Sequence, residues 1–207
     1  MNFYEPATLE EAVGLLTADE DARPLAGGAT LVAMMNADLV EPTSLVSLRQ
    51  IASLNGISVA SDGTVTIGAM TTHHAVANTE VLDGGQEIVR RAARVIGHPA
   101  IRNMGTMGGS ISHADPAADY PAALVAANAM IETFGPSGTR DIRAEDFFVD
   151  FLETSLEQGE LVSAVRLPPS SQGASSAYEK FARVDGDFAT LSVAVVVAMN
   201  TNICSQI

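Results

Sequence analysis

The chain has 207 residues, of which 47% are hydrophobic and 17% are charged. This length and composition predict a globular chain of one or two domains and exclude an extensively disordered one. The formal net charge of -14 argues against a nucleic-acid partner, because an acidic surface repels phosphate backbones, although it leaves room for a local diphosphate pocket.

The N-terminal residues 1–6 contain no basic segment followed by an apolar one, so no signal peptide is expected. The apolar run Leu191–Met199 is too short to span a bilayer and is typical of a core strand. We therefore expect a soluble, cytoplasmic protein without a membrane span. The single cysteine, Cys204, cannot supply the four thiolates of an ordinary iron–sulfur cluster. An electron-carrying cofactor must then be organic or lie on a partner.

Residues 1–56 are expected to form an N-terminal subdomain. Thr8 and Glu11 have the spacing of a capping box, and apolar residues from Leu9 to Leu16 repeat at helical spacing. The further elements expected here are a strand at 24–26, a helix or helical turn at 31–35 and a strand at 45–48.

Residues 57–169 are expected to form a second subdomain. The predicted elements are hairpins at 57–67 and 131–142, helices at 71–78, 86–96 and 120–129, and a strand at 161–167. Pro99 is expected to close the second helical region. A small-residue linker at 170–176 then leads to residues 176–207, the start of a C-terminal domain with strands at 177–183 and 188–199. This last piece is too small to be stable by itself, so we expect the chain to be cut short of its natural end.

Two glycine turns carry the strongest functional signal. Gly27-Gly28-Ala29-Thr30 follows the strand at 24–26, and Gly105 to Ser110 forms a second cluster that includes Thr106. Glycine allows backbone N–H groups to approach an oxyanion, and successive N–H groups form an anion-binding nest. Two such loops could grip a diphosphate without many positive charges. Ordinary tight turns are the alternative for each loop alone, and neither loop matches the P-loop or the Gly-x-Gly-x-x-Gly pattern.

The remaining polar candidates are fewer. His73 and His74 are adjacent at a helix start, where they point in different directions, so a shared metal is not expected. His113, Asp115 and Asp119 follow the second glycine cluster. Asp119 is either the N-cap of the next helix or a ligand for hydroxyl groups of a molecule held by the glycine loop. No nucleophile–histidine arrangement of a hydrolase is legible.

Several segments resemble one family. Residues 25–31 (Leu-Ala-Gly-Gly-Ala-Thr-Leu), residues 101–111 (Ile-Arg-Asn-Met-Gly-Thr-Met-Gly-Gly-Ser-Ile) and residues 113–119 are similar to the FAD-binding segments of the medium subunits of molybdenum hydroxylases. Residues 180–183 and 186–189 resemble the start of the C-terminal domain of that family. The similarity covers nearly the whole chain, and the second motif is the most specific part of it.

The resemblance implies an α+β fold of the vanillyl-alcohol-oxidase (PCMH) type, in which two α+β subdomains grip FAD in front of a C-terminal α/β domain. It implies diphosphate binding at both glycine segments, contact of Asp119 with FAD hydroxyls, and positions near the flavin ring for Lys180 and for Leu161 or Val162. Ile96 and Ile101 match adenine- or flavin-side contacts. The full expected cofactor-binding set is Leu25, Ala26, Gly27, Gly28, Ala29, Thr30, Leu31, Val32, Ile96, Ile101, Gly105, Thr106, Gly108, Gly109, Ser110, His113, Asp119, Leu161, Val162 and Lys180.

The resemblance also implies partners. A small subunit carries [2Fe-2S] clusters, a large subunit carries the molybdenum cofactor and oxidises the substrate, and FAD on this chain passes electrons to an external acceptor. A dimer of heterotrimers is the implied assembly. Carbon monoxide dehydrogenases tend to have His-Ser where this chain has Ala29-Thr30, which favours an N-heterocycle or an aldehyde as substrate. The alternatives are a carbon monoxide dehydrogenase medium subunit, a single-chain flavin oxidase of the same fold type, and an interaction module that has lost FAD.

Overall fold

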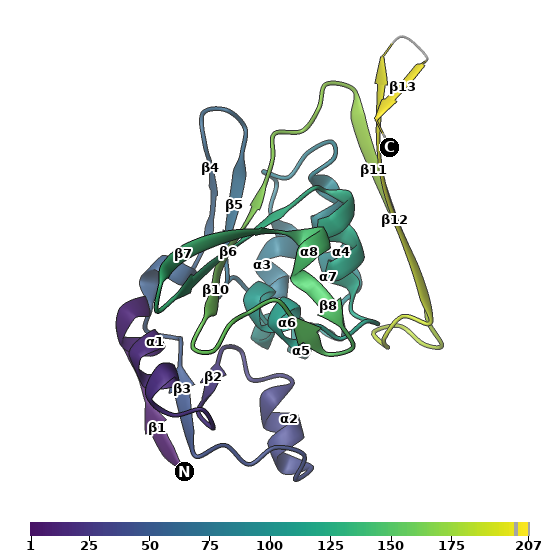
Figure 1. Ribbon diagram of the computed structural model, residues 1–207. Coiled ribbons are helices and arrows are strands. Elements are labelled where there is room, and N and C mark those ends of the chain that lie inside the picture. The colour runs from purple at the N-terminus through teal and green to yellow at the C-terminus, as the bar shows by residue number, and fades with distance from the viewer. Residues whose placement is uncertain (201–202, 207) are drawn as a thin grey trace.

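The computed structural model describes residues 1–200 and 203–206. In this part of the chain the strands form a three-stranded sheet near the N-terminus, a central five-stranded sheet, a three-stranded sheet near the C-terminus and a two-stranded hairpin. Helices cover one side of the central sheet and separate it from the C-terminal strands (Figure 1). The expected α+β class is confirmed. No helix in the described part of the chain has the length and apolar character needed to cross a membrane.

The N-terminal sheet is parallel. Its strand order is β1-β3-β2, with bounds Asn2–Tyr4, Ser44–Ser47 and Arg23–Leu25, and it is connected through helices α1 (Leu9–Ala18) and α2 (Leu31–Asn36). Strand β1 was not predicted, because three residues without alternation of polar and apolar side chains carry little signal. This sheet directs the end of β2 toward the first glycine turn (Figure 1).

The capping box at the start of α1 is confirmed. Thr8 Oγ1 accepts a hydrogen bond from the Glu11 backbone N–H at 3.2 Å, and Glu11 Oε2 accepts one from the Ala7 N–H at 2.9 Å. The helix buries Ala12, Val13 and Leu16, as its spacing indicates.

The central sheet is antiparallel throughout. Its strand order is β4-β5-β10-β6-β7, with bounds Ile57–Val59, Val65–Gly68, Leu161–Leu167, Met130–Gly135 and Gly138–Arg143. Both predicted hairpins and the predicted strand at 161–167 are confirmed.

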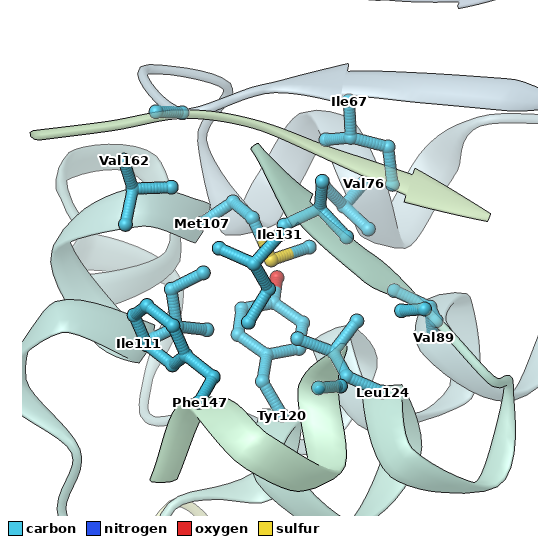
Figure 2. Close-up of a cluster of buried hydrophobic side chains, with 14 of the residues drawn as sticks. Ile67, Val76, Val89, Met107, Ile111, Tyr120, Leu124, Ile131, Phe147 and Val162 are labelled. Carbon is cyan, nitrogen blue, oxygen red and sulfur yellow. The ribbon is translucent and has the colours of Figure 1, made fainter. Parts of the chain in front are cut away.

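Helices lie on one side of this sheet, and most of them contribute residues to the core. They are η1 (Ala52–Leu54), α3 (His73–Asn78), α4 (Glu87–Val95), α5 (Pro99–Met104), α6 (Met107–His113), α7 (Asp119–Ala126) and α8 (Ala144–Phe147). Figure 2 shows the central part of this core, where Met107, Ile111, Tyr120 and Leu124 from the helices meet Ile131 of the sheet. All five side chains are fully buried.

Two local expectations were wrong. Pro99 does not close a helix; it is the first residue of α5, where its missing N–H costs nothing. The glycines at 108 and 109 do not lie in an open loop but in the first turn of α6, for which Thr106 is the N-cap. Glycine has a low helix propensity, so two adjacent glycines predict a loop. Here the N-cap and the packing around the segment stabilise a helix instead.

The C-terminal strands form an antiparallel sheet beside α4 and α7. They are β11 (Ala174–Phe181), β12 (Leu191–Asn200) and β13 (Ile203–Gln206), and β11 begins inside the expected linker. The C-terminal domain expected at 176–207 includes positions 201, 202 and 207, which lie outside the described residues. A separate hairpin, β8 (Phe148–Asp150) with β9 (Glu153–Thr154), precedes β10.

Candidate functional site

A cavity of about 830 Å³ lies between the N-terminal sheet, the α5–α6 segment, the start of β10 and the C-terminal strands. Its volume is in the range of small-molecule and cofactor sites. Of the expected cofactor-binding residues, all except Leu25 and Val32 line it. The lining members of that set are Ala26, Gly27, Gly28, Ala29, Thr30, Leu31, Ile96, Ile101, Gly105, Thr106, Gly108, Gly109, Ser110, His113, Asp119, Leu161, Val162 and Lys180.

The two glycine segments touch each other at the wall of this cavity. A Cβ atom placed on Gly27 would overlap the carbonyl oxygen of Met104 and would lie 3.1 Å from Gly105 Cα. The close approach of the two backbones therefore depends on the absence of a side chain at residue 27. Gly28 has a φ of 79°, a left-handed conformation that also favours glycine.

The first segment carries unused hydrogen-bond donors. Within residues 1–200 and 203–206, the backbone N–H groups of Gly28, Ala29 and Thr30 have no acceptor. These residues line the cavity and are not fully buried. Three successive N–H groups on a glycine turn form the kind of concave donor set that binds an anion.

The second segment differs from the expected nest. The N–H groups of Met107 and Gly108 bond to the carbonyls of Thr71 and Ala69, at 2.9 and 2.8 Å. Thr106 Oγ1 accepts from the Gly109 N–H at 3.2 Å, and the Thr106 carbonyl accepts from Ser110. The backbone donors of the first turn of α6 are thus already paired. What this segment presents to the cavity is a surface free of side chains, together with the hydroxyl groups of Thr106 and Ser110.

Asp119 is the first residue of α7, and Ala118 rather than Asp119 is the N-cap. Its carboxylate is buried and receives two donors from β11: the Tyr178 hydroxyl at 2.7 Å and Lys180 Nζ at 2.9 Å. Burial, more than the nearby carboxylate, raises the pKa of Tyr178, so its hydroxyl retains its proton and donates. Lys180 also donates to the Val95 carbonyl at 3.2 Å. This network fixes the C-terminal sheet to the wall of the cavity.

A buried histidine lies beside the junction of the glycine segments. His73 Nδ1 is 3.1 Å from the Tyr120 hydroxyl, and His73 lines the cavity although only 4% of the residue is exposed. A Cβ atom on Gly105 would lie 2.6 Å from His73 Nε2. Burial, assisted by the charge of Arg102, lowers the pKa of His73 to about 4, so the ring is neutral at pH 7.

Apolar side chains form another part of the wall. Leu161 and Val162 line it at the start of β10, next to a β-bulge between Val162 and Ala164. A bulge re-aims the side chains of a strand and is common beside functional sites. Ile96 and Ile101 line the cavity from the segment between α4 and α5.

Several residues at the cavity were not among the predicted site residues. His73 was considered as a metal ligand alone, yet within the described residues no group of three or more His, Cys, Asp or Glu side chains could hold a metal ion. Phe188 lines the cavity from the β11–β12 connection, and its only sequence signal was the Gly186–Ala189 motif. Leu152 lines it from the β8–β9 turn with a φ of 55°, for which the sequence gives no signal. Tyr178 could have been suspected from the alternation of β11, which buries it.

Comparison with known proteins identifies the family. Residues 1–170 match the family described as the FAD binding domain in molybdopterin dehydrogenase. The carbon monoxide dehydrogenase medium chain of Afipia carboxidovorans is 42% identical over 205 residues, covering 98% of this chain and 70% of the relative. The glyceraldehyde dehydrogenase medium chain of Sulfolobus acidocaldarius is 35% identical, with 97% and 71% covered. The nicotine 6-hydroxylase medium subunit of Paenarthrobacter nicotinovorans is 36% identical, with 96% and 69% covered.

Solved structures agree. A crystal structure of the Cu,Mo-CO dehydrogenase superposes with a TM-score of 0.94 at 41% identity, covering 99% of this chain and 71% of that one. The quinoline 2-oxidoreductase of Pseudomonas putida 86 gives a TM-score of 0.92 at 31% identity, covering 99% and 70%. These matches confirm the expected PCMH-type fold. The chain therefore belongs to the FAD-binding domains of molybdopterin dehydrogenases, as an FAD-binding medium subunit of the molybdenum hydroxylases.

Proposed function

We propose that this chain binds the diphosphate of FAD between the two glycine segments. The observation that carries the proposal is the contact of Gly27 with Met104 and Gly105, beside the unused N–H groups of Gly28, Ala29 and Thr30. The cationic side chains at the wall are already engaged: Arg23 Nη1 donates to two backbone carbonyls, and Lys180 is paired with Asp119. Neutral backbone donors, with the Ser110 hydroxyl, would then stabilise the charge of the diphosphate by hydrogen bonds, which suits an acidic protein.

The remaining expected contacts are part of the same proposal. Asp119 would receive hydrogen bonds from FAD hydroxyls through the acceptor positions that Tyr178 and Lys180 leave open. Lys180, with Leu161 or Val162, would lie near the flavin ring, and Ile96 and Ile101 would pack on the adenine or the flavin side. His113 would complete the polar wall. Leu25 and Val32 do not line the cavity, so they would support the first glycine turn from behind rather than touch FAD.

We infer a role for the chain within a larger enzyme. Bound FAD supplies the capacity to accept and release electrons one or two at a time. The protein holds the ring, excludes water from it and tunes its surroundings. We propose that a small subunit with [2Fe-2S] clusters delivers the electrons, that a large subunit with the molybdenum cofactor oxidises the substrate, and that an external acceptor receives them.

The finer assignments are proposals as well. They are a dimer of heterotrimers as the assembly and the cytoplasm as the location. The names of the relatives include carbon monoxide, glyceraldehyde and nicotine enzymes, so the preference for an N-heterocycle or aldehyde, based on Ala29-Thr30, stays a prediction.

The test is the FAD content of two matched glycine variants. Gly27→Ala inserts a methyl group where the Met104 carbonyl lies and should separate the segments, so FAD should be lost. Gly14→Ala is the control, since a Cβ atom on this exposed glycine of α1 would meet nothing within 4 Å. Flavin absorbance per folded chain is the measurement. Full FAD content in Gly27→Ala would refute the proposed site.

A further inference from the structure

We infer that His73 is an additional FAD-binding residue, whose Nε2–H donates a hydrogen bond to the diphosphate, and that Tyr120 positions it. This inference rests on the proposed function, because it requires FAD between the two glycine segments. Neither residue belongs to the glycine motifs.

The proton arrangement follows from counting donors and acceptors. The Tyr120 side chain is completely buried in the core shown in Figure 2, and among the described residues its hydroxyl has one partner, His73 Nδ1. A buried hydroxyl proton needs an acceptor. If Nδ1 carried a proton and donated to the phenol oxygen, the Tyr120 proton would have no acceptor. Tyr120 therefore donates to Nδ1, and the proton of the neutral imidazole lies on Nε2.

The Nε2–H group then has no acceptor in the described part of the chain. Among the described residues, His73 Nε2 is not one of the fully buried polar atoms that lack a partner, so this nitrogen keeps some exposure although only 4% of the residue is exposed. Nε2 lies beside Gly105, and Gly105 is the residue against which Gly27 packs. His73 also lines the cavity. The unpaired donor is thus located where the diphosphate of the proposed ligand would lie.

Two further contacts fix the imidazole. The His73 backbone N–H donates to the Gly105 carbonyl at 3.0 Å, so the helix that carries the ring is bonded directly to the second glycine segment. The ring centroids of His73 and Tyr120 lie 5.3 Å apart, and the ring planes meet at an angle of 60°. The ring orientation is therefore set before FAD binds, which reduces the entropic cost of the contact.

Three substitutions separate the roles of the two ring nitrogens. His73→Gln places an amide near the position of Nε2 and keeps a donor there. His73→Asn places an amide near Nδ1, so it can accept from Tyr120 but cannot reach the cavity. Tyr120→Phe removes the hydroxyl that selects the tautomer. The measurements are the FAD dissociation constant from quenching of flavin fluorescence, and the free energy of unfolding in urea as a check on folding.

We expect His73→Asn to weaken FAD binding about ten- to a hundredfold, because a hydrogen bond to a charged group is lost. His73→Gln should recover most of this loss. In the wild-type chain, two-bond ¹H–¹⁵N correlation spectra should show the proton on Nε2, and its resonance should shift when FAD is added. In Tyr120→Phe the Nδ1-protonated form should appear.

Three outcomes would overturn the inference while the proposed function stands: equal FAD affinity in wild type and a folded His73→Asn, equal losses in His73→Asn and His73→Gln, or an Nε2–H resonance that does not respond to FAD. Failure of the wild-type chain to bind FAD would instead overturn the proposed function. The spectra of the wild type decide the question even if a variant does not fold.

Discussion

Lys180 Nζ lies 2.9 Å from Asp119 Oδ2, and the two side chains are only 8% and 5% exposed. The pair connects β11 to the first turn of α7 at the wall of the cavity. Removing one member leaves the other charge buried without its counter-ion, which typically costs about 3–5 kcal/mol. We therefore expect Lys180→Met to lower the free energy of unfolding by an amount of that order.

An exposed ion pair provides the control for this prediction, and a double-mutant cycle measures the coupling between Lys180 and Asp119. Arg183→Met removes a side chain that is 84% exposed and pairs with Asp187, so the free energy of unfolding should change by less than about 1 kcal/mol. Lys180→Met, Asp119→Asn and the double variant should show a coupling energy of about 1–3 kcal/mol in urea denaturation. Additive losses would show that the pair contributes little to stability.

Asp119 is also predicted to contact FAD. Its substitution by alanine should weaken FAD about ten- to a hundredfold, since charge-assisted hydrogen bonds contribute roughly 1.5–3 kcal/mol. Tyr178→Phe separates this effect from loss of a buried partner of Asp119, because it removes the hydroxyl that donates to Asp119 Oδ1 and leaves the carboxylate, and Tyr178 does not line the cavity. If both variants lose stability but keep wild-type affinity for FAD in titrations, Asp119 has a structural role alone.

A larger side chain at residue 109 should project into the cavity without separating the two glycine segments. A Cβ atom there would lie 3.5 Å from Ala26 Cβ and 3.0 Å from Thr106 Oγ1. Gly109→Val should therefore abolish FAD binding, and Gly109→Ala should weaken it less. Gly14→Val is the control, because it adds the same side chain to an exposed glycine in open space. Stoichiometric FAD in a folded Gly109→Val would contradict the assignment of this wall.

The sequence predicted the regular elements well where their patterns are local. The capping box of Thr8 and Glu11, both hairpins and the strand Leu161–Leu167 depend on neighbours in sequence, and all are present. The glycine segments were recognised by motif, but their hydrogen-bond roles were not. The acceptors for the N–H groups of Met107 and Gly108 are carbonyls of Thr71 and Ala69, more than thirty positions away, which no local pattern reveals.

In the site, too, residues within contiguous motifs were predicted, whereas contacts between distant parts of the chain were not. The glycines and Asp119 stand in contiguous motifs, whereas Tyr178 reaches Asp119 across 59 positions and Tyr120 reaches His73 across 47. Such pairs form when strands and helices pack, so they require the tertiary structure. The buried histidine was undervalued because a sequence cannot state that one ring nitrogen is engaged and the other is free.

The neutral state of His73 predicts a dependence of stability on pH. Its pKa falls from 6.5 to about 4 on folding, so between these values the unfolded chain binds more protons than the folded one. The free energy of unfolding should therefore rise with pH across this window, and His73 should account for about 3 kcal/mol of the rise. Urea denaturation of the FAD-free chain from pH 4 to pH 7 would measure it.

His74, the residue next to His73, provides the control for this pH dependence of the free energy of unfolding. His73→Gln should flatten the rise, while His74→Gln, which removes an exposed imidazole, should leave it unchanged. A slope that persists in His73→Gln would assign the dependence to other groups.

The last prediction concerns the assembly. The chain contains one cysteine, and in the described part of it no cluster of side chains could hold a metal ion, while its relatives are named as medium chains and subunits of larger enzymes. The isolated chain loaded with FAD should accept electrons from a small chemical donor such as dithionite but should not oxidise an organic substrate.

In a preparation from the native source, without tags on any chain, iron and molybdenum should co-purify with the flavin. Substrate should then bleach the absorbance of the oxidised flavin. Chelation of molybdenum or loss of the large subunit should abolish bleaching by substrate and leave bleaching by dithionite intact. An active single chain free of molybdenum would overturn the subunit role and support the flavin oxidase alternative.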